Sequence, residues 1–103
     1  MTGKREVVEG RQYQGEDEQI IYSITTTNWA SDPASVSVAV KDNTAADVDV
    51  TASVTSGTTV TNGDLITLLT ITGLTAGHLY RVEVKFTAES SVFECYFIIE
   101  AEE

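Results

Sequence analysis

The stretch that decides the fold is Leu74-Thr75-Ala76-Gly77-His78-Leu79-Tyr80, which runs into a segment where apolar and charged residues alternate. In Greek-key β-sandwiches a leucine ends one strand, a glycine lets the chain turn, and a tyrosine opens the next strand. The tyrosine hydroxyl then bonds to the backbone a few residues upstream. Leu74, Gly77 and Tyr80 have the spacing of this tyrosine corner. The stretch therefore predicts two sheets joined at a corner, and it indicates no chemistry.

The rest of the chain divides into short runs rich in Val, Ile and Thr, which favour strands over helices. These runs predict seven strands, at 19–27, 35–41, 47–54, 58–61, 65–71, 79–87 and 92–100. Asn62-Gly63-Asp64 predicts a tight hairpin before the fifth strand. That strand does not alternate cleanly, so it is either buried on both faces or bulged. The pattern is typical of an all-β, seven-stranded antiparallel Greek-key sandwich of the immunoglobulin-like (fibronectin-like) class.

A chain of 103 residues is long enough for one domain with one modest core. Residues 1–18 are polar and charged, and they predict an N-terminal arm; residues 19–103 then form a single β-sandwich domain. The arm is either a frayed terminus or a segment that docks on a neighbouring subunit. In the second case Tyr13 is one of its few apolar contact residues.

The formal net charge of −10 excludes two classes of partner. So acidic a surface repels nucleic acid and anionic membranes. The acidity serves either solubility or the recognition of a basic protein surface. No apolar run is long enough to span a bilayer, and the first residues lack the apolar core of a signal peptide. We therefore expect the chain to be made in the cytoplasm.

The composition argues against an enzyme. The single cysteine, Cys95, shares a strand face with large apolar residues and is expected to be a small core residue. The single histidine, His78, lies in the corner and is expected to be exposed there, so the two residues should not form a nucleophile and base pair. No serine has the Gly-x-Ser-x-Gly context of a nucleophile elbow. The chain is expected to have no catalytic residues and no cofactor.

The chain has few side chains that could bind zinc and more that could bind calcium. Zinc sites need several Cys or His ligands, and the chain has two such residues in all. Asp42, Asn43, Asp47 and Asp49 cluster near one end of adjacent predicted strands and have the oxygen ligands that calcium prefers. Aspartate and asparagine are also common in turns for backbone reasons, and the spacing matches no EF-hand loop. No metal site is therefore predicted.

Three aromatic residues are candidates for contact with a partner. Trp29, in a turn before Pro33, is either a lid over the end of the sandwich or an anchor in a partner's pocket. Tyr96 shares the outer face of the last strand with Glu94 and Ile98, and Tyr13 lies in the arm. Such partly apolar faces meet other proteins or subunits.

The chain from Gly15 onward resembles the small immunoglobulin-like structural proteins of tailed bacteriophages, which include head-decoration, fiber-tail adaptor and baseplate upper-protein N-terminal domains. The resemblance rests on segments 15–22, 35–38, 50–51, 63–67 and 74–82, together with Trp29. It implies a non-enzymatic virion protein, made in the cytoplasm of a bacterial host, whose partners are other virion proteins or further copies of itself. A chain that ends directly after its last strand fits a decoration or adaptor role better than receptor binding.

A second hypothesis comes from a different class. The chain is then a stand-alone immunoglobulin-like module that binds a glycan or calcium through its loops. Trp29 and the aspartates between Asp42 and Asp49 are its support.

Overall fold

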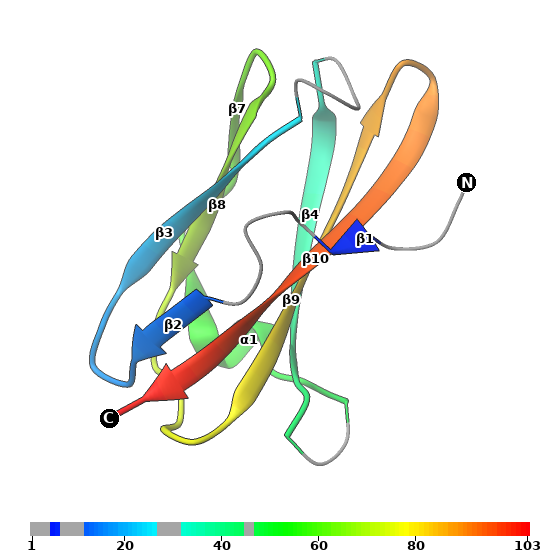
Figure 1. The fold of residues 1–103 in the computed structure, drawn as a ribbon. Coiled ribbons are helices and arrows are strands. Elements are labelled where there is room, and N and C mark those ends of the chain that lie inside the picture. Colours follow the sequence, from blue (N-terminus) through cyan, green and yellow to red (C-terminus); the bar gives the residue numbers. More distant parts are fainter. Residues whose placement is uncertain (1–4, 7–11, 27–31, 45–46) are drawn as a thin grey trace.

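Two β-sheets pack face to face in the computed structural model, which describes residues 5–6, 12–26, 32–44 and 47–103 (Figure 1). The six-stranded sheet has the order β1-β10-β9-β4-β5, and β2 also pairs with β10. Its strands are β1 (Arg5–Glu6), β2 (Gln12–Gly15), β4 (Ala34–Asp42), β5 (Val48–Asp49), β9 (Leu79–Ala88) and β10 (Ser91–Glu102). The four-stranded sheet has the order β3-β8-β6, with β7 also on β8. Its strands are β3 (Ile20–Thr25), β6 (Thr55–Ser56), β7 (Val60–Asn62) and β8 (Leu65–Ile71).

The predicted two-sheet sandwich is confirmed. The structure adds three short strands to the seven predicted, namely β1, β2 and β6. It also departs from a purely antiparallel arrangement, because β1 and β2 both pair with β10 in parallel. Among the described residues, no helix is long and apolar enough to cross a membrane.

Side-chain alternation places the core between the two sheets. Most inward residues of β9 and β10 are almost fully buried against those of β3 and β8, whereas on β4 only Val40 is fully buried and Val36 and Val38 are half-buried. Cys95 is 1% exposed and packs in this core, as its strand face predicted. Fully buried members from both sheets include Val40, Ile66, Leu68, Ile71, Val82, Val84, Phe86 and Ile99.

The unclear alternation of the fifth predicted strand is explained by a bulge in β8. Against β3, Ile21 lies opposite Thr70 whereas Ser23 lies opposite Thr67, so β8 has one extra residue between these pairs. On β8 the inward residues are therefore Ile66 and Leu68 before the bulge and Ile71 after it. Of the two alternatives, the bulge is the correct one.

The prediction of one strand over 47–54 is wrong for its second half. The chain forms β5 and then a single helical turn, α1 (Thr51–Val54). The Asp49 carboxylate accepts hydrogen bonds from the backbone N–H of Thr51 at 3.0 Å and from its hydroxyl at 2.7 Å. These local bonds compete with a strand ladder and turn the chain. Val54 is buried by the turn, whereas Val48 remains exposed.

Residues 12–15 are part of the sandwich and not of a separate polar arm. They form β2, which lies beside the C-terminal end of β10 and close to β3 (Figure 1). Gln14 is fully buried there. Its amide nitrogen donates to the carbonyl oxygens of Ile71 at 2.8 Å and Glu18 at 3.0 Å, and its amide oxygen accepts from the Tyr22 hydroxyl at 2.9 Å. One side chain thus connects the six-stranded sheet to β3 and β8 of the other.

The pKa of the Tyr22 hydroxyl is shifted by its position between β2 and β3. Burial, assisted by the negative charge of Glu18, raises the pKa of Tyr22 to about 12. The hydroxyl is therefore protonated at neutral pH and donates its hydrogen bond to Gln14.

We predict that Gln14→Leu lowers the free energy of unfolding by about 2–3 kcal/mol, because it leaves the partners of a buried amide without their hydrogen bonds. Urea denaturation of the two proteins measures this difference. Tyr13→Leu, on the exposed side of the same strand, is the matched control and should cost less than about 1 kcal/mol. Equal losses in both variants would show that the Gln14 amide does not join the sheets.

Candidate functional site

The corner residues lie where one end of β9 meets the end of β10. Leu74 and Tyr80 are buried, and Gly77 has φ +85°, a conformation that favours glycine. The backbone N–H of Thr75 donates to the Tyr80 hydroxyl at 2.9 Å, five residues upstream of the tyrosine. This is the geometry of a tyrosine corner. It stabilises the connection between the sheets and supplies no reactive group.

His78 is half-buried in this corner and bonded to Asp42, a contact that the sequence did not indicate. Its Nδ1 lies 2.7 Å from the Asp42 carboxylate, and its ring stacks on Tyr80 with centroids 6.2 Å apart. The same carboxylate accepts hydrogen bonds from the backbone N–H and the hydroxyl of Thr44, at 3.1 and 2.7 Å. Desolvation opposes these contacts, but the hydrogen bonds from Thr44 and His78 prevail and lower the pKa of Asp42.

Asp47 and Asp49, the other aspartates weighed as calcium ligands, also have partners within the chain. Asp47 pairs with Arg81 at 2.6 Å, and Asp49 lies 3.5 Å from the Lys41 ammonium and accepts from Thr51. Hydrogen bonds from Thr51 lower the pKa of Asp49. In the described part of the chain, no three His, Cys, Asp or Glu side chains converge as a metal site.

Cys95 and His78 do not meet. Cys95 lies opposite Val84 in the middle of β10, whereas the backbone N–H of Ala101, six residues further along, donates to the His78 carbonyl. Six residues of strand span roughly 20 Å. Burial also raises the pKa of the Cys95 thiol to about 11, so it is protonated at neutral pH. The two residues cannot act together as nucleophile and base.

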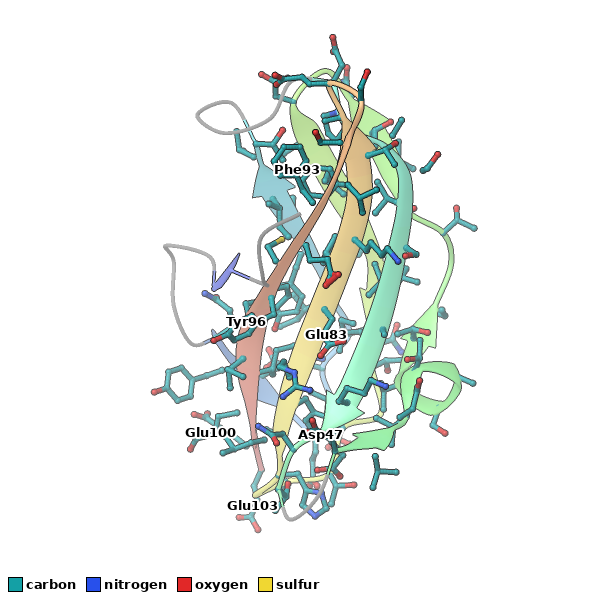
Figure 2. All side chains as sticks on the ribbon, turned by 90° about the vertical axis from the view of Figure 1, so that its right-hand side faces the viewer. Asp47, Glu83, Phe93, Tyr96, Glu100 and Glu103 are labelled. Atoms are coloured by element: carbon teal, nitrogen blue, oxygen red, sulfur yellow. The ribbon has the colours of Figure 1, made fainter. Side chains whose placement is uncertain are left out.

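Tyr13 and Tyr96 lie on the same outer face of the six-stranded sheet. Tyr96 is opposite Glu83 of β9, and Glu100 lies four residues beyond Tyr96 on β10 (Figure 2). Tyr13 of β2 is opposite Glu100. Residues two or four apart on a strand share a face. The phenol of Tyr13 is 57% exposed, whereas Tyr96 is half-buried. Trp29, the third predicted contact residue, lies outside the described residues.

Charged side chains surround these tyrosines. The Arg81 guanidinium bonds Glu83 at 2.7 Å and Asp47 at 2.6 Å, which raises the pKa of Arg81. Beside them a shallow groove of about 430 Å³ runs over the outer side of β4, β9 and β10. It forms because β4 presents small side chains next to the longer ones of its neighbours. The groove is lined by Ser37, Val38, Ala39, Glu83, Val84, Lys85 and Glu94.

The fold defines the chain as an immunoglobulin-like β-sandwich. Comparison with known families gives the narrower assignment, because residues 22–98 match the family described as the Arylsulfotransferase Ig-like domain. The match covers more than half of the chain, which therefore belongs to this family. A search of curated proteins found no match. These findings support a small Ig-like domain; the resemblance to tailed-phage proteins stays a prediction.

We predict that Tyr80→Phe lowers the free energy of unfolding by about 1–2 kcal/mol, because the N–H of Thr75 loses its acceptor. Thermal or urea denaturation measures the loss. Tyr96→Phe removes the same atom from a half-buried ring on the outer face of β10, and it should change stability by less than about 0.5 kcal/mol. A Tyr80→Phe variant as stable as its Tyr96→Phe control would contradict the corner's role.

Asp42 should contribute stability that depends on pH. Because its pKa is lowered in the folded state, the contribution is present above the usual value of 3.8 and is lost as the pH falls through the folded value. We predict that wild type is more stable than Asp42→Asn at pH 6 and that the difference shrinks at about pH 2–3. Urea denaturation at both pH values tests this. Asp17→Asn, in an exposed turn, is the control variant. A stability gap for Asp42→Asn that stays constant between the two pH values would refute the prediction.

Proposed function

We propose that this chain is a non-enzymatic structural protein that acts through protein–protein contacts. The supporting observation is the outer face of the six-stranded sheet, where Tyr13 and Tyr96 flank Ile98 on two paired strands. Tyrosines on rigid strands supply large contact area at small entropic cost, and they are enriched at interfaces. Ion pairs around Arg81 form a polar rim beside them. The contact surface is therefore Tyr13, Tyr96 and Ile98 with this rim.

The state of the reactive residues also favours a non-enzymatic role. The His78 ring nitrogen is bonded to Asp42, and the Cys95 thiol is buried with a raised pKa. A general base and a nucleophile must lie within hydrogen-bond reach of each other. Six residue positions along β10, roughly 20 Å of strand, separate Cys95 from Ala101, the residue that bonds the His78 backbone.

The setting that we propose for this contact is the particle of a tailed bacteriophage, where the chain serves as a decoration or adaptor protein. The sequence resemblance supports this setting. On a repeated protein lattice, many weak contacts of one small face add up to stable attachment. A contact surface built from two tyrosines and one isoleucine would suffice there.

A second candidate is favoured by the family assignment. The family is described as the Ig-like domain of arylsulfotransferase, so the chain can instead be an accessory domain that packs on a protein of that kind. The same tyrosine face would then contact an enzyme rather than a particle. In both candidate functions the chain itself binds another protein and catalyses no reaction.

The ligand-binding alternative has less support from the site. The carboxylates of Asp42, Asp47 and Asp49 already accept hydrogen bonds or pair with basic side chains of the chain. A calcium ion would have to displace these contacts. A rise in melting temperature on adding calcium would nevertheless favour that alternative over the contact role.

We predict that the tagged chain, expressed in bacteria that produce the phage, cosediments with the phage particles in a density gradient. Tyr13→Ser with Tyr96→Ser should reduce the bound amount by about tenfold or more, because central aromatic residues dominate interface energies. Val48→Ser with Val92→Ser removes exposed apolar area outside this contact surface, on β5 and at the other end of β10, and is the control. Copurification with arylsulfotransferase activity would favour the second candidate. Failure to associate with either, or equal effects of the two double variants, would contradict the proposed surface.

A further inference from the structure

The four-stranded sheet carries no charge, unlike the rest of this strongly acidic molecule. The chain has 16 acidic and 6 basic residues. None of them occurs in β3, β6, β7 or β8, all of which lie in the described part of the chain. The strands of the other sheet, by contrast, carry acidic and basic residues along β4, β9 and β10. Within the residues that the structure describes, charge is therefore confined to the six-stranded sheet and to the loops.

The outer side of this sheet, which we term the neutral face, is apolar with small hydroxyl groups between. Ile21, Val60 and Leu65 are 60%, 58% and 38% exposed. Cross-strand register places them together with hydroxyl residues: Val60 and Ser23 both lie opposite Thr67, and Leu65 lies opposite Thr25. The bulge in β8 puts Thr70, and not an apolar core residue, beside Ile21. In Figure 1 this face points away from β4, β9 and β10.

We propose that the neutral face binds the same face of a second copy of this chain. Two molecules that each carry −10 repel each other wherever their charged surfaces meet. The neutral face lets two copies touch without placing carboxylates against carboxylates. A basic partner, in contrast, would be drawn to the acidic surfaces and gain nothing from an uncharged one. Two sheet faces also pack on one another in an aligned arrangement.

The size of the face determines the strength of this contact. Strand β8 has seven residues and is about 23 Å long. Together with the strands paired on either side of it, it is about 14 Å wide. The neutral face thus covers roughly 300 Å², whereas a stable interface buries about 800 Å² on each partner. The dimer is therefore weak and depends on concentration. On a surface that already holds many copies, it would link neighbours.

Salt distinguishes this contact from one that depends on charge attraction. Raising NaCl from about 0.1 M to about 1 M shortens the Debye length from about 10 Å to about 3 Å. Screening reduces the repulsion between two copies of equal charge, so the self-contact becomes stronger. Binding to a basic partner through the acidic surface would become weaker under the same change. The sign of the salt effect thus identifies the kind of partner.

Sedimentation velocity of the purified full chain, at concentrations up to about 1 mM and at both salt concentrations, tests the proposal. We expect a mass average that rises from monomer towards dimer with concentration and rises further at high salt. Ile21→Glu with Val60→Glu places like charges in the contact and should weaken dimerisation by about tenfold or more. Ala52→Glu with Ser91→Glu adds the same charge at exposed positions off the neutral face and is the matched control.

Two results would overturn the proposal. The first is a wild-type chain that stays monomeric at every concentration and salt. The second is a dimer whose affinity changes to the same extent, or not at all, in both double variants. Circular dichroism of each variant shows whether it is folded. This inference does not depend on the tyrosine face: particle binding can fail while the dimer forms, and the reverse can occur.

Discussion

The buried amide of Gln14 is the contact on which the closed edge of the sandwich depends. Two packed sheets are held together mainly by their apolar inner faces, and apolar packing alone does not fix where a polar edge strand lies. Gln14 fixes β2 because it satisfies the Tyr22 hydroxyl and the Ile71 carbonyl, groups that belong to the other sheet. A buried polar group is costly when it lacks partners. The backbone ladder with β10 and the requirement to satisfy these groups together determine the position of β2, and through it the exposed position of Tyr13.

The tyrosine corner lies at the same end of the sandwich as Gln14, because Ala101 of β10 is opposite Gln14 and its carbonyl accepts a hydrogen bond from the Gly77 N–H. The Tyr80 hydroxyl accepts from Thr75, and the Ala101 N–H donates to the His78 carbonyl, which holds the corner against β10. Asp42 then links His78 to the end of β4. Since β10 also pairs with β2, the corner and the Gln14 contact act on the same strand. The tyrosine face on β2 and β10 is thus supported by two sets of hydrogen bonds at one end of the sandwich.

Most of the sandwich could be predicted from the sequence because period-two alternation depends only on which residues are apolar. Strand β8 was predicted with its observed bounds, and β4, β9 and β10 within two residues at each end. The sequence could not predict β2, because Gln12-Tyr13-Gln14 is polar in composition and its partners lie in distant strands. The helical turn at Thr51 was missed for a different reason, since Val48 and Val50 continue the alternation while Asp49 makes local hydrogen bonds.

The candidate surfaces were less predictable than the fold. Tyr96 and Tyr13 were identified as separate residues, and only the parallel pairing of β2 with β10 places them on one face. The contact between Asp42 and His78 joins residues 36 positions apart, so no local pattern could indicate it. The uncharged strands are visible in the sequence. That they form one sheet, however, follows from the topology alone.

The two outer faces explain how one fold can serve different partners. In a sandwich the inward residue of each pair determines packing, and the outward residue can change without altering the core. Family membership therefore describes mainly the inward half of each strand, and it does not decide what the outward half binds. Here the outward halves differ sharply between the sheets: tyrosines among ion pairs on one, and uncharged β-branched and hydroxyl residues on the other. A difference of this kind, on opposite sides of a rigid core, allows one side to contact a foreign surface while the other contacts a neighbouring copy.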